Sequence, residues 1–274
     1  MIRTLVIGPV VFFSALFGSV YFQKRLIYNN WGPQPRIEWE CEVDVEEVQF
    51  KTADGETLCG FWGNGPQLDD WALPDKPVVL FCHGNSWTID YWRWVIDRWT
   101  WLIGADVLIF DYRGYGRSTG SPSEDGLYRD ARGAYDYLVK ERNIDPRRIV
   151  IVGQSLGGGV ALQLAENVDH KMLVLESTFT SMCDVVDDLF LGMPMSRFCD
   201  EKFPNFERIQ NYKKPLFMSH GTDDRLILFS QAEKLFEAAG GPKQFWPVDG
   251  MRHNDQRDHF IYMAFIRDFM TENW

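Results

Sequence analysis

A serine set between glycines is the feature of this chain whose surroundings first suggest chemistry. The segment Gly153-Gln154-Ser155-Leu156-Gly157 follows a β-branched run, Arg148–Val152, and precedes small and apolar residues at helical spacing. A strand that enters a helix through G-x-S-x-G forms a nucleophile elbow, a sharp turn that strains the serine backbone and exposes its hydroxyl. Because a bare match arises by chance in about one chain in ten, the prediction depends on partners for Ser155 elsewhere in the sequence.

The base that would activate Ser155 must be a histidine, because a hydroxyl is a weak nucleophile until its proton is removed. The chain has five histidines. In the order serine, acid, base, which this alternation of strands and helices predicts, the base comes late. His253 follows the last predicted strand, where a loop can bring it over the elbow, whereas His259 is expected to open the final helix. We therefore predict that His253 is the base.

A carboxylate should orient that histidine. The segment His220-Gly221-Thr222-Asp223-Asp224 follows a predicted strand and offers two aspartates. We favour Asp224, which stands just before Leu226-Ile227, because Asp223 equally fits a turn or a helix cap. Glu176, at the end of the strand after the elbow, is a third candidate that spacing alone does not exclude.

The negative oxygen of a tetrahedral intermediate needs hydrogen-bond donors, normally two backbone N–H groups. Leu156 begins the helix after the elbow, where unpaired N–H groups and the helix dipole favour an anion. The second donor is expected from Asn85 or Ser86, in the turn His83-Gly84-Asn85-Ser86 after the first parallel strand.

The order of the remaining elements predicts an α/β fold. From Pro77 onward, strands and helices alternate, which is typical of a mostly parallel sheet covered by helices on both faces. A hairpin about Ala53–Glu56 precedes them. We expect about eight strands, at residues 43–51, 57–62, 78–82, 107–110, 148–152, 172–176, 215–219 and 244–248, and helices at 89–102, 126–142, 183–191, 230–239 and 259–270, besides the helix after the elbow.

The N-terminal segment Leu5–Phe22 contains no charged residue and is just long enough to cross a bilayer as a helix. A cleaved signal peptide and a buried helix are the alternatives, but no A-x-A-like cleavage site follows the segment. We predict a single-pass membrane anchor at residues 1–25, a linker at 26–40 and one α/β domain at 41–274. Three basic residues after the segment outnumber the one before it, which favours a cytoplasmic domain.

Residues 179–212 interrupt the alternation with about one helix and then irregular sequence rich in Met and Phe. An apolar insertion at this place predicts a small lid over the site. Met193 and Phe198 are its candidate substrate-pocket residues, although ordinary packing would equally explain such side chains.

Composition excludes some functions and leaves others open. The formal net charge of −11 argues against nucleic acid as a partner, because the phosphates would be repelled. The five cysteines are scattered without metal-ligand spacing, so neither a disulfide framework nor a zinc site is indicated, although Cys183 and Cys199 could pair. The 11 Trp and 20 Phe fit either a large core or a broad apolar site.

With these motifs in place, the sequence resembles the α/β-hydrolase superfamily. More narrowly, it is similar to the membrane-anchored α/β-hydrolase-domain-containing proteins and the bud-emergence type hydrolases, some of which remove palmitate from proteins. The segments that carry the likeness span nearly the whole chain: Arg25–Tyr28, Thr52–Gly55, His83–Asn85, Asp111–Ser118, Gly153–Gly158, Glu176–Ser181, His220–Asp224 and Gly250–Asp255.

The resemblance implies an α/β-hydrolase fold with Ser155 as nucleophile, Asp224 as acid and His253 as base. It also implies that the Asp111–Ser118 run is a structural turn whose charges bind internal partners. In one respect the chain departs from the family, which tends to continue with small residues after His83-Gly84-Asn85. Here Trp87 occupies that stretch, and a tryptophan beside the oxyanion turn would narrow the acyl pocket.

The sequence therefore predicts a membrane-anchored serine hydrolase that cleaves an ester or thioester, with a fatty acyl group on a lipid or a protein as substrate. The chemistry requires no metal or cofactor. A non-catalytic membrane scaffold is an alternative, but its signature, a missing triad member, is absent. A serine peptidase is another, but nothing in the sequence marks a specificity pocket for an amine-side chain.

Overall fold

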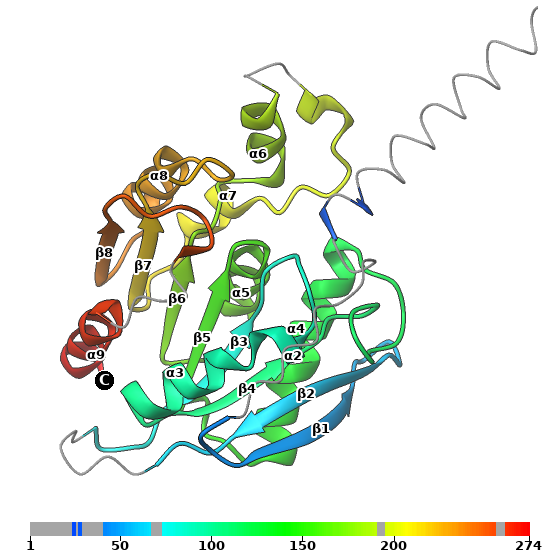
Figure 1. Ribbon diagram of the computed structural model, residues 1–274, viewed down its shortest axis with the longest axis vertical. Coiled ribbons are helices and arrows are strands. Elements are labelled where there is room, and N and C mark those ends of the chain that lie inside the picture. The colour runs from blue at the N-terminus through cyan, green and yellow to red at the C-terminus, as the bar shows by residue number, and fades with distance from the viewer. Residues whose placement is uncertain (1–23, 26, 29–40, 67–72, 191–194, 256–260) are drawn as a thin grey trace, which may run out of the picture.

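The computed structural model describes residues 24–25, 27–28, 41–66, 73–190, 195–255 and 261–274. Within them, an eight-stranded sheet has the order β1-β2-β4-β3-β5-β6-β7-β8 (Figure 1). The strands β3 to β8 are parallel, whereas β2 pairs antiparallel with both β1 and β4. Their bounds are Val45–Lys51, Thr57–Gly63, Val78–Cys82, Asp106–Phe110, Ile149–Gln154, Met172–Glu176, Leu216–Gly221 and Lys243–Val248. The predicted mostly parallel sheet with an N-terminal hairpin is confirmed.

Helices cover both faces of the sheet, so its central strands are buried on two sides (Figure 1). In β3, Val79 and Phe81 pack with α3 (Trp94–Ile103) and α9 (Ile261–Asn273), whereas Val78 and Leu80 pack with the opposite layer. That second layer contains α4 (Glu124–Asp136), α5 (Leu156–Asn167) and α8 (Phe229–Ala238). Continuous apolar runs such as Ile149–Val152 follow from this burial of alternate residues on opposite faces.

The bounds of the predicted helices shift by a few residues in the structure, and those expected at 89–102 and 126–142 differ most. The helix expected at 89–102 is divided into α2 (Ile89–Trp92) and α3, with Arg93 between them. α4 begins before the expected Gly126 because the Ser123 side chain caps it, accepting a hydrogen bond from the Gly126 N–H. Its last turn is a π-helix, Tyr137–Glu141.

The predicted lid, residues 179–212, contains more structure than the one helix expected. α6 spans Met182–Leu189, a 3-10 turn spans Met195–Phe198 and α7 spans Asn205–Ile209. The base of the insertion is closed by Asn205, whose side-chain amide donates to the Phe179 carbonyl at 2.9 Å. The insertion thus stands on the layer formed by α5 and α8, above the carboxyl ends of the strands (Figure 1).

The N-terminal region enters the described structure at Lys24, Arg25, Ile27 and Tyr28. Ile27 and Tyr28 are buried, and the Tyr28 hydroxyl donates to the Glu201 carboxylate at 2.8 Å. The start of the predicted linker is therefore packed on the domain at these two residues. The predicted anchor segment Leu5–Phe22 lies outside the described residues. No helix in the described part of the chain combines the length and hydrophobicity that crossing a bilayer requires. All five cysteines, Cys183 and Cys199 included, are free thiols.

Candidate active site

Ser155 lies on a strained turn between β5 and α5. Its φ of 54° and ψ of −119° are unusual for any residue other than glycine. The two flanking glycines are needed for close approach, since a Cβ on Gly157 would stand 2.0 Å from the Cys82 carbonyl oxygen. A Cβ on Gly153 would stand 2.3 Å from the Gly157 carbonyl oxygen. The turn leaves Ser155 partly exposed at the carboxyl end of the sheet.

The three residues predicted as a triad meet in the structure. The His253 Nε2 lies 3.0 Å from the Ser155 Oγ, and the His253 Nδ1 lies 2.6 Å from the Asp224 Oδ2. His253 comes from the loop after β8, and Asp224 from the loop after β7. With a proton on Nδ1 donated to the carboxylate, Nε2 is free to accept the serine proton. Distances of this size suit general-base activation of a hydroxyl.

The Asp224 carboxylate is buried and receives hydrogen bonds on both oxygens. The Oδ1 accepts from the N–H groups of Leu226 and Ile227, each at 2.9 Å, and the Oδ2 lies 3.2 Å from the His220 Nε2. Burial alone would raise the pKa of Asp224, but the hydrogen bonds from His220 and His253 hold it below its ordinary value. The carboxylate is therefore ionised at neutral pH and can orient His253.

His220 is a participant that the sequence reasoning did not assign. It is fully buried, and its Nε2 also lies 2.9 Å from the Ile227 carbonyl oxygen. The available signal was its spacing, because His220 precedes Asp224 by one turn's length of chain at the end of the same strand. That position brings the His220 imidazole into contact with the Asp224 carboxylate.

The alternative acids are placed elsewhere. Asp223 is exposed. Glu176 is buried in an ion pair with the Arg98 guanidinium at 2.8 Å and also accepts from the Tyr262 hydroxyl. A carboxylate committed to Arg98 is not available to His253. Of the alternative bases, His259 lies outside the described residues.

The remaining histidines are structural. The His83 Nδ1 lies 2.7 Å from the Gly84 carbonyl oxygen, and burial lowers the pKa of His83 to about 4. The His170 Nε2 lies 2.9 Å from the Tyr212 hydroxyl, and burial lowers its pKa to about 4 as well. Both imidazoles are neutral at physiological pH.

The predicted oxyanion residues flank the serine. Asn85 and Ser86 line one cavity together with Ser155 and His253. Leu156 begins α5, and its side chain is buried rather than part of the cavity lining. The turn that carries Asn85 is held by two buried phenols, because Tyr112 donates to the His83 carbonyl and Tyr115 to the Asn85 carbonyl, each at 3.0 Å.

The cavity lined by Ser155 and His253, which we call the catalytic cavity after its candidate role, has a volume of about 220 Å³, and four Trp and Tyr side chains form part of its wall. Trp87, a predicted pocket residue, is part of that wall. The other predicted pocket residues are not placed: Met193 lies outside the described residues, as does the side chain of Phe198. The cavity is lined by Gly84, Asn85, Ser86, Trp87, Tyr91, Trp92, Trp94, Gln154, Ser155, Leu226, His253 and Asn254.

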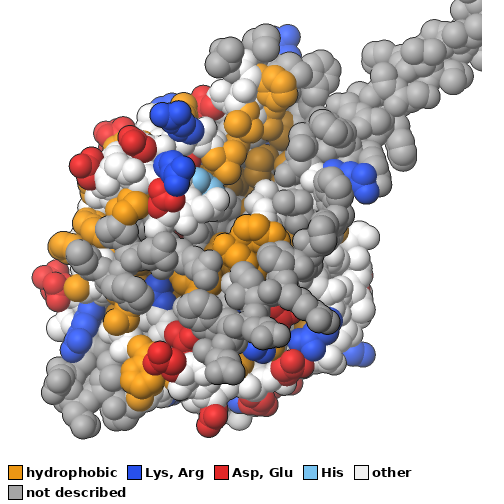
Figure 2. Space-filling model, viewed as in Figure 1, with side chains coloured by type: hydrophobic (Ala, Val, Ile, Leu, Met, Phe, Trp, Pro, Cys, Tyr) orange, Lys and Arg blue, Asp and Glu red, His pale blue; other side chains and the backbone are white. Residues whose placement is uncertain are grey.

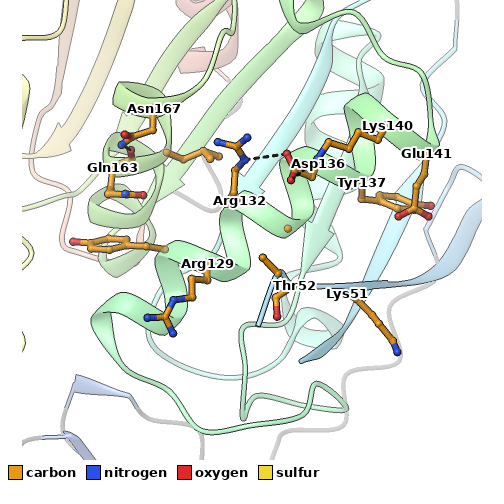
Figure 3. Close-up of a pocket in the computed structure, with 14 residues that line it drawn as sticks. Lys51, Thr52, Arg129, Arg132, Asp136, Tyr137, Lys140, Glu141, Gln163 and Asn167 are labelled. Carbon is orange, nitrogen blue, oxygen red and sulfur yellow. Dashed lines mark hydrogen bonds and ion pairs between the residues drawn. The ribbon is translucent and has the colours of Figure 1, made fainter. Parts of the chain in front are cut away.

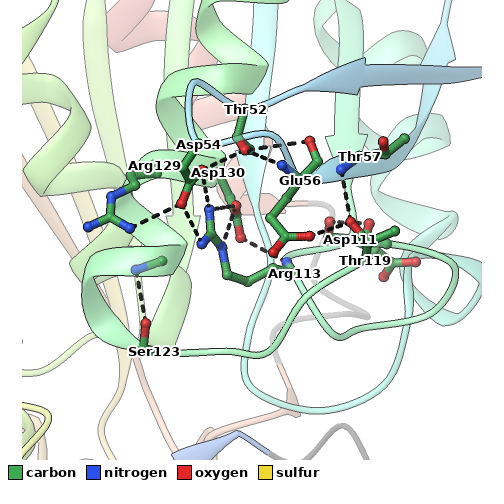
Figure 4. Close-up of polar contacts among 12 residues, drawn as sticks. Thr52, Asp54, Glu56, Thr57, Asp111, Arg113, Thr119, Ser123, Arg129 and Asp130 are labelled. Carbon is green, nitrogen blue, oxygen red and sulfur yellow. Dashed lines mark hydrogen bonds and ion pairs between the residues drawn. The ribbon is translucent and has the colours of Figure 1, made fainter.

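In the Asp111–Ser118 run, Asp111 and Arg113 bind internal partners, as the resemblance implied, whereas Arg117 pairs with Glu47 on the surface at 2.9 Å. Asp111 accepts a hydrogen bond from the Ile89 N–H at 2.9 Å, which fixes the start of α2 beside the cavity. Figure 4 shows the Arg113 guanidinium between Asp54 of the hairpin turn and Asp130 of α4, with contacts of 2.9 Å to each. These charges join the hairpin, the turn and α4 and do not reach Ser155.

A second, larger hollow of about 550 Å³ lies between α4, α5 and the hairpin turn (Figure 3). We call it the cationic groove, because Lys51, Arg129, Arg132 and Lys140 line it. Asp136 pairs with both Arg132 and Lys140 at 2.9 Å. No histidine or cysteine lines the groove, and the described residues hold no cluster of His, Cys, Asp and Glu suited to a metal ion.

The elbow, the eight-stranded sheet and the order of serine, acid and base define an α/β hydrolase. The chain belongs to the alpha/beta hydrolase family, whose model matches residues 79–267.

Relatives cover nearly all of the chain. An uncharacterised protein of Mycobacterium tuberculosis is 35% identical over 96% of this chain and 95% of its own. Protein bem46 of Schizosaccharomyces pombe is 33% identical over 93% of this chain and 88% of its own. Human alpha/beta hydrolase domain-containing protein 17B is 30% identical over 86% and 80%. Among solved structures, the Pyrococcus furiosus esterase Pf2001 superposes with a TM-score of 0.70 at 20% identity, covering 88% of this chain and 96% of that one. The last likeness supports the fold alone.

Proposed function

We propose that this protein is a membrane-anchored serine hydrolase that cleaves a carboxylic ester or thioester, of a fatty acyl group, through an acyl-enzyme on Ser155. One observation carries the proposal: the hydrogen-bonded series from Asp224 through His253 to the Ser155 hydroxyl, at 2.6 and 3.0 Å. The serine stands on a strained elbow at the mouth of a cavity, where an acyl carbonyl can reach it.

The mechanism follows from these contacts. As Ser155 Oγ attacks the carbonyl carbon, His253 Nε2 takes the hydroxyl proton, and the buried Asp224 carboxylate stabilises the imidazolium. The N–H groups of Leu156 and Asn85 are the proposed donors to the tetrahedral oxyanion. His253 then gives its proton to the leaving alcohol or thiol, and a water molecule activated by the same imidazole releases the acid and restores Ser155.

Exposed apolar side chains support a lipid-like acyl group. Leu189 and Phe190 at the end of α6, and Leu226 and Leu228 after Asp224, are among the large hydrophobic residues left exposed. Figure 2 shows apolar side chains gathered over α6 and continuing toward the middle of that face. Leu226 also lines the catalytic cavity, so the apolar surface reaches its opening. Exposed apolar surface of this kind favours contact with a lipid or an acylated protein.

The anchor is proposed from the sequence of Leu5–Phe22 and from where the chain after it lies. Tyr28 and Lys24 both contact Glu201 of the lid, at 2.8 and 3.2 Å, so the chain enters the domain beside the lid. An anchor preceding this point would bring the lid and the cavity opening near the membrane. Protease protection on intact membranes would test the proposed cytoplasmic side.

The nucleophile is tested with a fluorophosphonate probe on the full chain in membranes. Wild-type protein should be labelled, and Ser155→Ala should not. The Ser230→Ala variant is a matched control for the loss of a serine hydroxyl, because Ser230 is exposed on α8 and does not line the cavity, and labelling should persist. Labelling of Ser155→Ala at the wild-type rate would exclude Ser155 as nucleophile.

The substrate class is tested with p-nitrophenyl esters of increasing chain length and an S-palmitoyl peptide. Turnover of these acyl substrates, lost in Ser155→Ala, is the expected result. A wild-type protein that turned over none of them would refute the acyl hydrolase and favour a non-catalytic scaffold, whereas cleavage of peptide bonds alone would identify a peptidase.

A further inference from the structure

Side-chain hydrogen bonds to three carbonyl groups hold the turn after β3, and this turn carries Trp87. Besides the two phenols bound to the His83 and Asn85 carbonyls, the Trp92 indole N–H donates to the Ser86 carbonyl at 3.0 Å. Trp87 itself has a φ of 65°, a left-handed conformation that a bulky side chain rarely adopts. Strained conformations of this kind persist where surrounding structure imposes them and are concentrated at functional sites.

The strained backbone sets the Trp87 ring against Tyr91, with the ring centroids 3.9 Å apart. Both residues are partly exposed, whereas Trp92 and Trp94 behind them are buried in the core. All four line the cavity that contains Ser155. Trp92 and Trp94 are thus part of the hydrophobic core. Trp87 and Tyr91 form the outer side of the cavity wall, where a substitution should disturb the core less.

The size of the cavity limits what can bind inside it. An apolar cavity of about 150 Å³ holds a benzene molecule, and the catalytic cavity measures about 220 Å³. If each methylene takes roughly the 30 Å³ of a water molecule in the liquid, about seven carbons of an acyl chain would fill it. A longer chain has to leave the cavity, and the exposed Leu226 at its edge leads onto the apolar surface.

We propose that Trp87, backed by Tyr91, is the specificity-determining residue for acyl-chain length. The carbons nearest the scissile carbonyl lie inside the aromatic wall, and any carbons beyond about the seventh leave past Leu226. This inference rests on the proposed hydrolase function and refines its substrate. It assigns the limit on chain length to the β3–α2 turn rather than to the lid.

The test compares p-nitrophenyl esters from C4 to C16 with wild type, Trp87→Phe and Trp87→Gly. Glycine adopts the φ of this position without strain, so the backbone of the turn is retained. In the wild type, kcat/KM should reach its maximum near C6 to C8. In Trp87→Gly the ratio of kcat/KM for C12 over C6 should rise at least about tenfold, the size expected for new room in an apolar pocket. Trp87→Phe should fall between the two.

Two further variants separate a specificity role from a structural one. Trp101→Ala removes an indole that is 47% exposed on α3 and absent from the cavity lining, and it should keep the wild-type chain-length profile. Leu226→Ser should lower kcat/KM only for esters longer than C8. Labelling by a fluorophosphonate in each variant reports whether Ser155 and His253 remain correctly placed.

The outcomes distinguish this inference from the function on which it rests. Normal labelling and hydrolysis of C4 esters, with superimposable chain-length profiles for wild type and Trp87→Gly, would overturn the assignment of Trp87 alone. Absence of both labelling and hydrolysis in the wild type would overturn the hydrolase and the assignment together. A C12 preference that appears in Trp87→Gly and not in Trp101→Ala would confirm the assignment.

Discussion

The catalytic cavity and the cationic groove show that the larger hollow is not the one equipped for chemistry. The groove is more than twice the volume of the cavity, about 550 against 220 Å³, yet its Arg132 and Lys140 side chains pair with Asp136 on the surface. The cavity lies where the turn after β3, the end of β5 and the loops after β7 and β8 meet, and the last two loops supply Asp224 and His253 in a hydrogen-bonded series to Ser155. The candidate site is therefore distinguished by the groups that separate strand ends bring together, and not by the volume of its cavity.

Among variants that test the difference between the two hollows, Asp224→Asn should cause the largest loss of activity. The amide would favour the wrong imidazole tautomer, so kcat should fall by about 10⁴-fold while the fold is retained. Asp223→Asn, at the exposed neighbouring position, should stay within about twofold of wild type because rim charges contribute little. Steady-state kinetics on a short ester measure both. Equal losses in the two variants would show that the wrong aspartate had been assigned.

Glycine substitutions in the two regions should have opposite signs. In Gly157→Ala the new Cβ would meet the Cys82 carbonyl oxygen at 2.0 Å, a backbone atom that cannot rotate away. We expect a loss of about 3 kcal/mol in the free energy of unfolding. Gly133, in α4 and beside the groove, would meet nothing closer than 3.4 Å, so Gly133→Ala should stabilise by up to about 1 kcal/mol.

Urea unfolding monitored by circular dichroism gives both free energies. A stable Gly157→Ala protein would contradict the close packing of α5 against the end of β3. A destabilised Gly133→Ala protein would show that a methyl group does not fit beside the groove, against the 3.4 Å spacing found for its Cβ.

Burial lowers the pKa of two histidines, His83 and His170, so both should make the fold sensitive to acid, and the simpler one to test is His170, which lines neither hollow. Its folded pKa of about 4 lies below the ordinary value of 6.5, so the unfolded chain binds more protons between these values. Stability is therefore complete above pH 6.5 and is lost as the pH falls toward 4, by up to about 3 kcal/mol. His170→Gln should remove the His170 share of this decline and leave the His83 share. Melting temperatures at pH 7.5, 6 and 5 provide the measurement, and an unchanged slope in the variant would refute the assignment.

The smallest effect is expected from the groove itself. Arg132→Gln combined with Lys140→Gln removes two ion pairs to Asp136 on an exposed helical surface, each worth about 0.5 kcal/mol or less. Ester hydrolysis should remain within about twofold of wild type. A tenfold loss of activity at unchanged stability would mean that the groove takes part in the reaction and that the contrast between the two hollows is false.

Much of the site could be predicted because its members follow strands in a fixed order. The motif G-x-S-x-G, an aspartate after the next-but-one strand and a histidine after the last one are visible in sequence, and the parallel sheet brings them to one edge. The predicted eight strands were confirmed for the same reason, since buried strands are recognisable as short β-branched runs.

Other features depend on contacts that sequence spacing does not contain. The break at Arg93 between α2 and α3 has no marker in the sequence, and the contact between His220 and Asp224 depends on the fold of the loop after β7. The turn before the left-handed Trp87 is held by hydrogen bonds from Tyr112, Tyr115 and Trp92 to its carbonyl groups, and no local sequence pattern predicts these contacts. The lid's extra turns lie in a stretch without clear periodicity, which is why only one helix was expected there.

Glu201 has a mechanical consequence for this molecule. Its carboxylate receives the Tyr28 hydroxyl, the Lys24 ammonium and the N–H of Glu124 at the start of α4. Glu201 of the insertion therefore joins the N-terminal residues Lys24 and Tyr28 to the start of α4 in the second helical layer. We therefore expect a displacement of Lys24 and Tyr28 to move the insertion and the start of α4 with them.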